Sequence, residues 1–194
     1  GIGHYFVPRY TRVVDTAESK DNINKAYNLI STSKVRNEMI IDDVITCVAR
    51  KQTPVILTRF KEHAKFLHDA LKEKADHVFL LYGDNSDKEN AEIRVKLKQI
   101  PENESLILVA TGQKIGEGFD FPRLDVLMLA APVSFEGRLE QYVGRLNRDY
   151  VGKEAVYVYD YIDSHVRYFD KMYAKKIENV QEDRIFNLDA RVAT

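Results

Sequence analysis

The sequence predicts an α/β fold built on an open, mostly parallel sheet of five or six strands. Strand-like runs alternate along the chain with helical segments of roughly 10–15 residues, the pattern that βαβ units produce. Three of the runs are almost continuously apolar, as expected for parallel strands that helices cover on both faces. These runs are SLILVAT (residues 105–111), VLMLAAP (126–132) and AVYVYDYI (155–162).

The first half of the chain supplies two strands and two helices. RYTRVV at residues 9–14 has the composition of a short strand, and a polar stretch follows it. Residues 33–51 carry an apolar stripe at helical spacing. PVILTR at 54–59 is a brief β-branched run, and the segment 61–74 returns to a helical pattern. The stripe of the first helix consists of Ile40, Ile41, Val44, Ile45 and Val48.

The second half continues the same alternation. HVFLLYG at residues 77–83 is a strand that stops at its glycine, and 87–100 is a charged amphipathic helix that Pro101 ends. The three apolar runs follow, with a further helix expected at 134–148 between the last two. Ligands of such sheets bind beyond the carboxyl ends of the strands. The polar residues that follow the strands are therefore the first place to look for a site.

Composition excludes several functional classes. The net charge of −1 gives no overall field that would attract nucleic acid or a membrane, so any basic site is local. The longest apolar run, residues 126–133, falls far short of the ~20 residues that cross a bilayer. The single cysteine allows no disulfide within the chain, and no signal peptide opens it, so we expect a cytoplasmic protein. The five histidines have no partners at metal-binding spacing, so no metal site is expected.

The segment LEQYVGRLNRDY, residues 139–150, contains the pattern Q-x-x-G-R-x-x-R. On a helix, Gln141, Arg145 and Arg148 share one face, and the apolar residues of the segment lie on the opposite face. Gly144 borders the polar face and lets a backbone or a nucleotide come close. One interpretation is an ordinary solvated face. The other is a phosphate site, because forked guanidinium donors match a multiply charged phosphate.

A glycine-rich loop, ATGQKIGEGFDFP, follows the strand at 105–111. Its glycines allow a ligand to approach the backbone closely. Thr111 offers a hydroxyl to a phosphate oxygen, and Asp120 could accept a hydrogen bond from a ribose hydroxyl. The alternative is a plain turn in which Asp120 caps the backbone before Pro122.

The sequence has no phosphate-binding P-loop of the form G-x-x-x-x-G-K-[ST]. Its one Gly-Lys pair, at residues 152–153, is followed by Glu154. No Asp-Glu pair ends an apolar strand where it could hold magnesium. We therefore expect that this chain cannot bind and hydrolyse a nucleoside triphosphate by itself.

Three segments together resemble the motifs of superfamily 2 helicases. Residues 107–132 (ILVATGQKIGEGFDFPRLDVLMLAAP) are similar to motif V, and 139–148 (LEQYVGRLNR) are similar to motif VI. Residues 53–67 (TPVILTRFKEHAKFL) look like motif IV. The residues of motifs V and VI, EGFDFPRLD and QYVGRLNR, resemble the type III restriction subunit group more than the DEAD-box RNA helicases. The DEAD-box proteins usually carry histidine at the position of Gln141.

The resemblance implies roles for motif VI and the end of motif V at ATP. Arg145 and Arg148 would reach the γ-phosphate, with Arg148 the better arginine-finger candidate, and Gln141 would lie near the same cleft. Asp120 would approach the nucleotide sugar. Gly118 would give that aspartate room, and Gly144 would border the nucleotide.

The resemblance also implies contacts with the nucleic-acid backbone. Thr111 of motif V would touch it, and Thr58 and Arg59 of motif IV are further candidates. Lys114 is a further candidate for a contact with a phosphate. Backbone contacts do not read sequence, so sequence preference should be weak.

The implied fold is a RecA-like three-layer α/β/α domain that spans residues 1–194. Residues 1–50 would form an N-terminal strand and helix segment, 51–165 would carry motifs IV to VI, and 166–194 would be a C-terminal helix or tail. ATP and Mg²⁺ would be held mainly by an N-terminal RecA-like domain of the same full-length protein. The isolated chain should therefore be inactive.

The implied function is the second motor domain of an ATP-dependent helicase or translocase that acts on DNA. Two alternatives stay open. One is a RecA-like module that binds nucleic acid or a partner without catalysis, and the other is an RNA helicase domain. Under each of these hypotheses, we expect no membrane as a partner.

Overall fold

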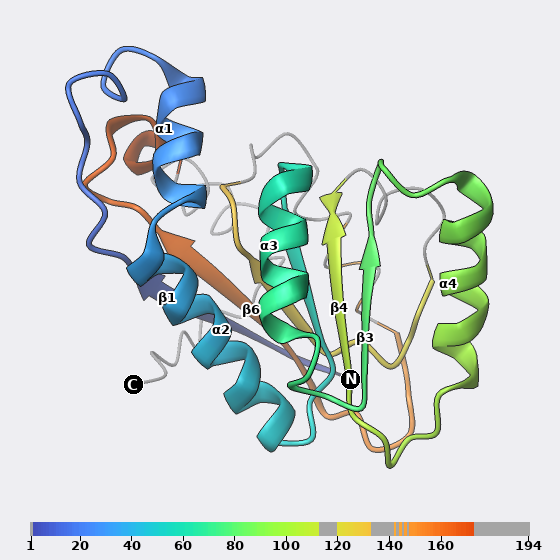
Figure 1. The fold of residues 1–194 in the computed structure, drawn as a ribbon. Coiled ribbons are helices and arrows are strands. Elements are labelled where there is room, and N and C mark those ends of the chain that lie inside the picture. The colour runs from blue at the N-terminus through green and yellow to red at the C-terminus, as the bar shows by residue number, and fades with distance from the viewer. Residues whose placement is uncertain are drawn as a thin grey trace.

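The computed structural model describes residues 2–112, 120–132, 142, 144, 146 and 148–172. Within them a six-stranded sheet has the order β1-β6-β5-β2-β4-β3, and every pair of neighbouring strands is parallel (Figure 1). The strands are β1 (Gly3–Tyr10), β2 (Pro54–Thr58), β3 (His77–Leu81), β4 (Leu106–Thr111), β5 (Val126–Leu129) and β6 (Ala155–Ile162). The helices are α1 (Ile23–Ser31), α2 (Lys34–Ala49), α3 (Lys61–Leu71) and α4 (Asp87–Gln99).

Side chains of the central strands alternate between two cores, one on each face of the sheet. In β4, Leu106 and Leu108 belong to the core that includes Leu97 of α4. The intervening Ile107 and Val109 belong to the core that α2 and α3 cover. Figure 1 shows α2 and α3 lying across this second face. The three-layer α/β/α arrangement and the parallel sheet predicted from the apolar runs are confirmed.

Local sequence signals set the ends of the helices. Asn22 caps α1, and its side chain accepts from the backbone N–H groups of the first turn. Ser33 caps α2 in the same way. Ser86 and Glu89 form a reciprocal capping box at the start of α4. These side chains satisfy donors that have no partner inside the helix, so α1, α2 and α4 each begin directly after their cap. The N-cap of α3, Phe60, makes no such hydrogen bond.

The first strand lies earlier than expected, at Gly3–Tyr10 instead of 9–14. Pro8 within it removes a backbone donor, which argues against a central strand. The strand tolerates this proline because β1 is at the edge of the sheet and pairs with β6 alone. Because of this proline, the sequence pattern did not predict the edge strand at its true position.

Helix α1 was not predicted, although its sequence carries the signal. Ala26, Tyr27 and Ile30 are buried against Val166 and Phe169, which follow β6. Their spacing is that of one helical face. The surrounding polar residues hid this short stripe.

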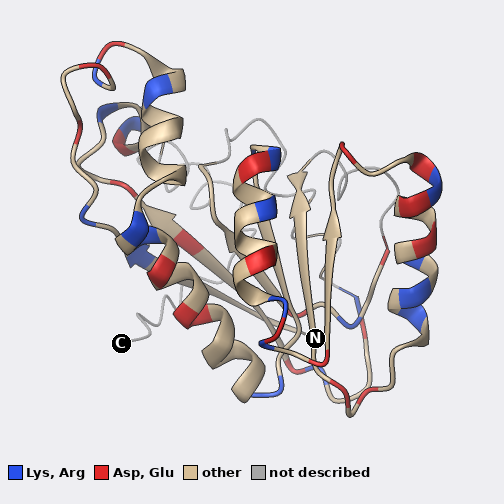
Figure 2. Ribbon diagram, in the orientation of Figure 1, with Lys and Arg blue, Asp and Glu red and all other residues tan. Residues whose placement is uncertain are grey.

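Basic and acidic side chains are interspersed along α3, whereas α4 is mainly acidic in its first half and basic in its second half (Figure 2). Both helices carry charges of both signs, in agreement with the net charge of −1. In the part of the chain that the structure describes, every helix is too short or too polar to cross a bilayer. The predicted tail beyond residue 172 lies outside the described residues.

Candidate functional site

Two of the predicted site residues meet in the folded chain. Nε of Arg148 lies 3.6 Å from Oδ1 of Asp120, and the two side chains are 54% and 53% exposed. The residues come from the end of the motif VI segment and the end of the glycine-rich loop, which are far apart in sequence. An ion pair this exposed contributes little to stability, so both groups can change partner when a ligand arrives.

The core anchors the segment that carries Arg148. Tyr142 and Leu146 are buried in the same core as Phe121, which directly follows Asp120. Gly144 is exposed, as is Arg148 itself. The division into an apolar docking face and a polar face, expected from the helical pattern, is confirmed for these residues. Anchoring on one core fixes both halves of the Arg148–Asp120 pair relative to each other.

Lys153 joins the same two segments, and sequence reasoning missed it. Its Nζ donates to the carbonyl of Pro122 at 2.9 Å and also to the carbonyl of Leu146. Burial lowers the pKa of Lys153, and the nearby carboxylate of Asp125 opposes that shift. In the sequence this lysine belongs to the Gly-Lys pair that does not match the P-loop pattern. Its partners are backbone carbonyls, which no residue pattern reveals.

The first glycine of the loop lies close to a neighbour in motif VI. A Cβ atom built on Gly112 would lie 2.5 Å from Oη of Tyr142, closer than real Cβ contacts permit. Thr111, one residue earlier, is the last residue of β4 and pairs in register with Thr58 of β2. The loop with its nucleic-acid candidate and the helix with its arginines are thus in direct steric contact.

The motif IV candidates have partners of their own. The hydroxyl of Thr58 is buried and lies 2.6 Å from Nδ1 of His63. The guanidinium of Arg59 lies over the ring of Tyr27, 4.5 Å from its centroid, and donates to its hydroxyl at 3.1 Å. Arg59 remains exposed, so it can meet a phosphate without losing this support. Roles for both residues in nucleic-acid binding stay predictions.

His63 is the centre of a closed hydrogen-bond chain. The amide nitrogen of Asn37 donates to the carbonyl of Ser31, so its oxygen accepts from Nε2 of His63 at 2.8 Å. Nδ1 of His63 then has no proton and accepts from Thr58. Burial, with a smaller contribution from Arg36, lowers the pKa of His63 to about 3. The imidazole is therefore neutral across the physiological range.

Several predicted site residues lie outside the described residues. These are Gln141 and Arg145 of motif VI, and Lys114 and Gly118 of the loop. Their assignments remain predictions. The residues that the structure does describe contain no group of three or more His, Cys, Asp or Glu side chains that could hold a metal ion.

The structure is thus a parallel α/β domain in which an exposed arginine and an exposed aspartate lie together. Residues 35–149 match the helicase conserved C-terminal domain family. The chain belongs to this family, so the resemblance to the C-terminal domain of helicases is confirmed.

Poxvirus proteins are among its relatives. The transcript termination protein A18 of Yaba-like disease virus is 30% identical over 138 residues, which cover 68% of the chain and 28% of that protein. The protein of the same name from myxoma virus is 24% identical over 157 residues, which cover 76% of the chain and 32% of that protein. The chain thus spans about a third or less of the length of these relatives.

A solved structure shares the fold. The crystal structure of T4 UvsW superposes with a TM-score of 0.74 at 21% identity and covers 99% of the chain. The match takes up 41% of the UvsW chain.

Proposed function

We propose that this chain is the second motor domain of an ATP-dependent helicase or translocase that acts on DNA. The observation that carries the proposal is the exposed pair formed by Arg148 and Asp120. The sequence has no P-loop, so the phosphates of the nucleotide need a second, N-terminal RecA-like domain of the same full-length protein. The two domains would enclose one ATP between them.

The residues present fit one side of a nucleotide. The guanidinium of Arg148 is solvent-accessible and can donate two parallel hydrogen bonds to phosphate oxygens. The carboxylate of Asp120, next to it, can accept from a ribose hydroxyl. The described residues offer no carboxylate cluster for Mg²⁺, so the proposal assigns that ion to the other domain.

The chemistry that this domain supplies is electrostatic. Bound ATP with Mg²⁺ supplies the phosphoryl group and the free energy for movement. Arg148 would exchange the carboxylate of Asp120 for the γ-phosphate and stabilise the negative charge that develops during transfer. Lys153 and the buried Tyr142 hold the segment in place, so little reorganisation is needed at that moment.

Nucleic acid would bind at the carboxyl ends of β2 and β4. Thr58 and Thr111 pair in register at these ends, and Arg59 follows directly. Contacts to a sugar-phosphate backbone hold any sequence. Alternate closing and opening of the two domains would then move the domain along the strand.

The printed names of the poxvirus relatives favour one alternative. Those proteins are transcript termination proteins, which places them at a process that involves RNA. An RNA helicase domain is therefore the second candidate. Unwinding assays on matched DNA and RNA duplexes separate the two, and faster unwinding of RNA would overturn the choice of DNA.

The arginine assignment is tested by Arg148→Ala in the full-length protein. We expect nucleic-acid-stimulated ATP hydrolysis to fall by ~10³-fold or more, because one such arginine is worth that factor in related sites. Steady-state ATPase measurements at saturating nucleic acid give the result. Arg148→Lys keeps the charge but loses the fork, so most of the loss should persist.

Arg12→Ala is the matched control, because Arg12 is exposed and lies far along the chain from both motifs. It should leave turnover unchanged. If Arg148→Ala turns over ATP like the unmodified protein, Arg148 is not the arginine finger. If the full-length protein hydrolyses no ATP, the non-catalytic module is the correct reading.

A further inference from the structure

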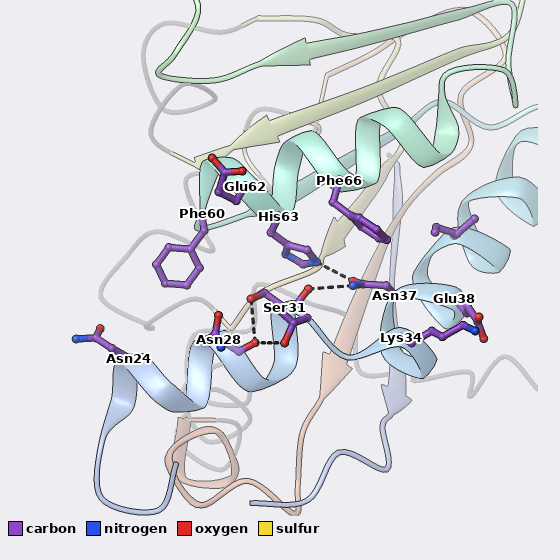
Figure 3. Close-up of a pocket in the computed structure, with 12 residues that line it drawn as sticks. Asn24, Asn28, Ser31, Lys34, Asn37, Glu38, Phe60, Glu62, His63 and Phe66 are labelled. Carbon is purple, nitrogen blue, oxygen red and sulfur yellow. Dashed lines mark hydrogen bonds between the residues drawn. The ribbon is translucent and has the colours of Figure 1, made fainter. Parts of the chain in front are cut away.

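A pocket of about 890 Å³ opens between α1, α2 and α3 (Figure 3). Its lining residues from Phe60 to Phe66 belong to the motif IV segment, and two of the three helices that form it precede motif IV. A pocket of this size accommodates a drug-sized ligand. It begins at Phe60, directly after Thr58 and Arg59, which are the predicted backbone contacts of motif IV.

One wall of the pocket is aromatic. Phe60, His63 and Phe66 follow one another at three-residue spacing, so they line one side of α3. Figure 3 shows the three rings on the side of α3 toward α1 and α2. Phe66 is 53% exposed. The wall therefore exposes the ring of Phe66 and part of the ring of Phe60, whereas His63 is buried beneath them.

The facing wall carries free amides. Asn24 and Asn28 lie one turn apart on α1, and both are exposed. Their side chains make no hydrogen bond with another described residue. Each carboxamide offers donors and an acceptor in one plane, which is the group that pairs with the edge of a base.

The floor of the pocket is polar but already satisfied. Asn37 and His63 bind each other, Thr58 and the carbonyl of Ser31, and His63 is neutral. The charges around the pocket are one lysine against two glutamates: Lys34, Glu38 and Glu62. The pocket therefore does not attract a phosphate, and its occupant is neutral, planar and polar at its edge.

We propose that this pocket takes unstacked bases of a single-stranded nucleic acid, with the phosphates left outside near Arg59. The inference rests on the proposed function, since it requires that the domain binds nucleic acid. Aromatic side chains stack on bases of any sequence, and amides can add a preference through the base edges. A hydrophobic peptide would also cover Phe66, but it would bury Asn24 and Asn28 without partners.

The test compares two strands of equal length in the full-length protein. One is a single-stranded oligonucleotide with bases, and the other is an abasic strand with the same backbone. Affinities are measured by fluorescence anisotropy at one fixed salt concentration, because backbone binding depends on salt. The unmodified protein should bind the strand with bases more tightly.

Three substitutions of exposed residues test whether the pocket causes the difference in affinity between the two strands. Phe66→Leu keeps an apolar side chain without a ring, and it should weaken binding of the strand with bases by about 5-fold or more. Phe66→Tyr keeps the ring and should retain the preference. Val95→Ala on α4 is the control, since Val95 is an exposed apolar residue outside the pocket. Binding of the abasic strand should be the same in all three.

The outcomes separate the pocket from the function. Equal binding of both strands by the unmodified protein, or an unchanged preference in Phe66→Leu, would overturn the proposal and leave the pocket to a protein segment. Binding of neither strand would overturn the proposed function itself. As a second measurement, photocrosslinking with iodouracil-containing strands should label Phe60 or Phe66, and labels confined to other helices would contradict the proposal.

Discussion

Gly112 illustrates at the scale of one residue how the two motifs are joined. A Cβ atom at this position would collide with the hydroxyl of Tyr142, so a side chain there requires that buried tyrosine to shift. Close approach, and not a positive φ, therefore favours glycine here; among the glycines that the structure describes, Gly152 has the positive φ. A glycine-rich loop in the sequence indicates such an approach but does not identify the neighbour.

Gly112→Ala should lower the free energy of unfolding by about 1–3 kcal/mol, the usual cost of overpacking. Tyr142→Phe in the same chain should recover part of this loss. It removes the atom at 2.5 Å and leaves Cζ at 3.3 Å. Denaturant unfolding of both single variants and the double variant gives the coupling energy. Additive effects would show that the two residues do not press on each other.

The predictability of the site differs from residue to residue. Exposure of Arg148 and burial of Tyr142 follow from helical periodicity, so the sequence alone indicated them. The approach of Arg148 to Asp120 depends on a loop and a helix meeting on one core. The clamp by Lys153 depends on carbonyl positions. Contacts of this kind depend on the tertiary structure, so residue spacing in the sequence cannot predict them.

At the scale of elements, Asp125 connects the amino ends of β2 and β5. It lies just before β5, and its Oδ1 accepts from the backbone N–H of Thr53 at 2.7 Å. Burial raises the pKa of Asp125 to about 6 from an ordinary value of 3.8, against the effect of the Thr53 hydrogen bond. The folded chain therefore holds a proton here in a pH range where the unfolded chain has lost it.

The stability that this proton provides is present below pH ~4 and is lost as pH rises through ~6. Relative to Asp125→Asn, the unmodified chain should lose up to about 3 kcal/mol of unfolding free energy across that range. Asparagine keeps the oxygen that Thr53 needs, so it is a matched control. Urea unfolding at a series of pH values measures both chains. Parallel pH profiles would mean that Asp125 titrates normally.

The elements themselves were predictable to different degrees. Strands β2 to β6 and helices α2 to α4 follow from long apolar runs and clear stripes. Helix α1 is short, and β1 contains Pro8. The apolar pattern of each element is therefore too weak to predict it from the sequence. Both belong to the segment for which no motif was recognised, and α1 then supplies a wall of the proposed base pocket.

At the scale of the molecule, one buried ion pair ties the layers together. Arg36 of α2 and Asp163 after β6 are fully buried, with Nε and Oδ1 2.9 Å apart and a second contact at 3.1 Å. Arg36 also donates to the carbonyl of Ala130 beyond β5, and Thr11 donates to Asp163 at 2.6 Å. Segments that follow β1, β5 and β6 are thereby fixed to one helix.

Arg36→Met should destabilise the protein by about 3–5 kcal/mol, because it leaves the charge of Asp163 buried without a partner. Adding Asp163→Asn should restore a large part of that loss, since asparagine is neutral and still accepts from Thr11. Thermal and denaturant unfolding of the single and double variants provide the comparison. A double variant no more stable than Arg36→Met would contradict this account.

The strand order also has a consequence for synthesis of the chain. β1 leaves the ribosome before the other five strands of the sheet, yet its one partner is β6, with Gly3 opposite Ala155 and Tyr10 opposite Ile162. Phe6 and Val7, buried in the finished sheet, therefore wait for almost the whole domain to be translated. Contacts so distant in sequence form slowly, and unpaired apolar strands attract other chains meanwhile. The danger of misassembly is greatest in the interval before β6 emerges, when the other strands of this sheet are available and β1 is still unpaired.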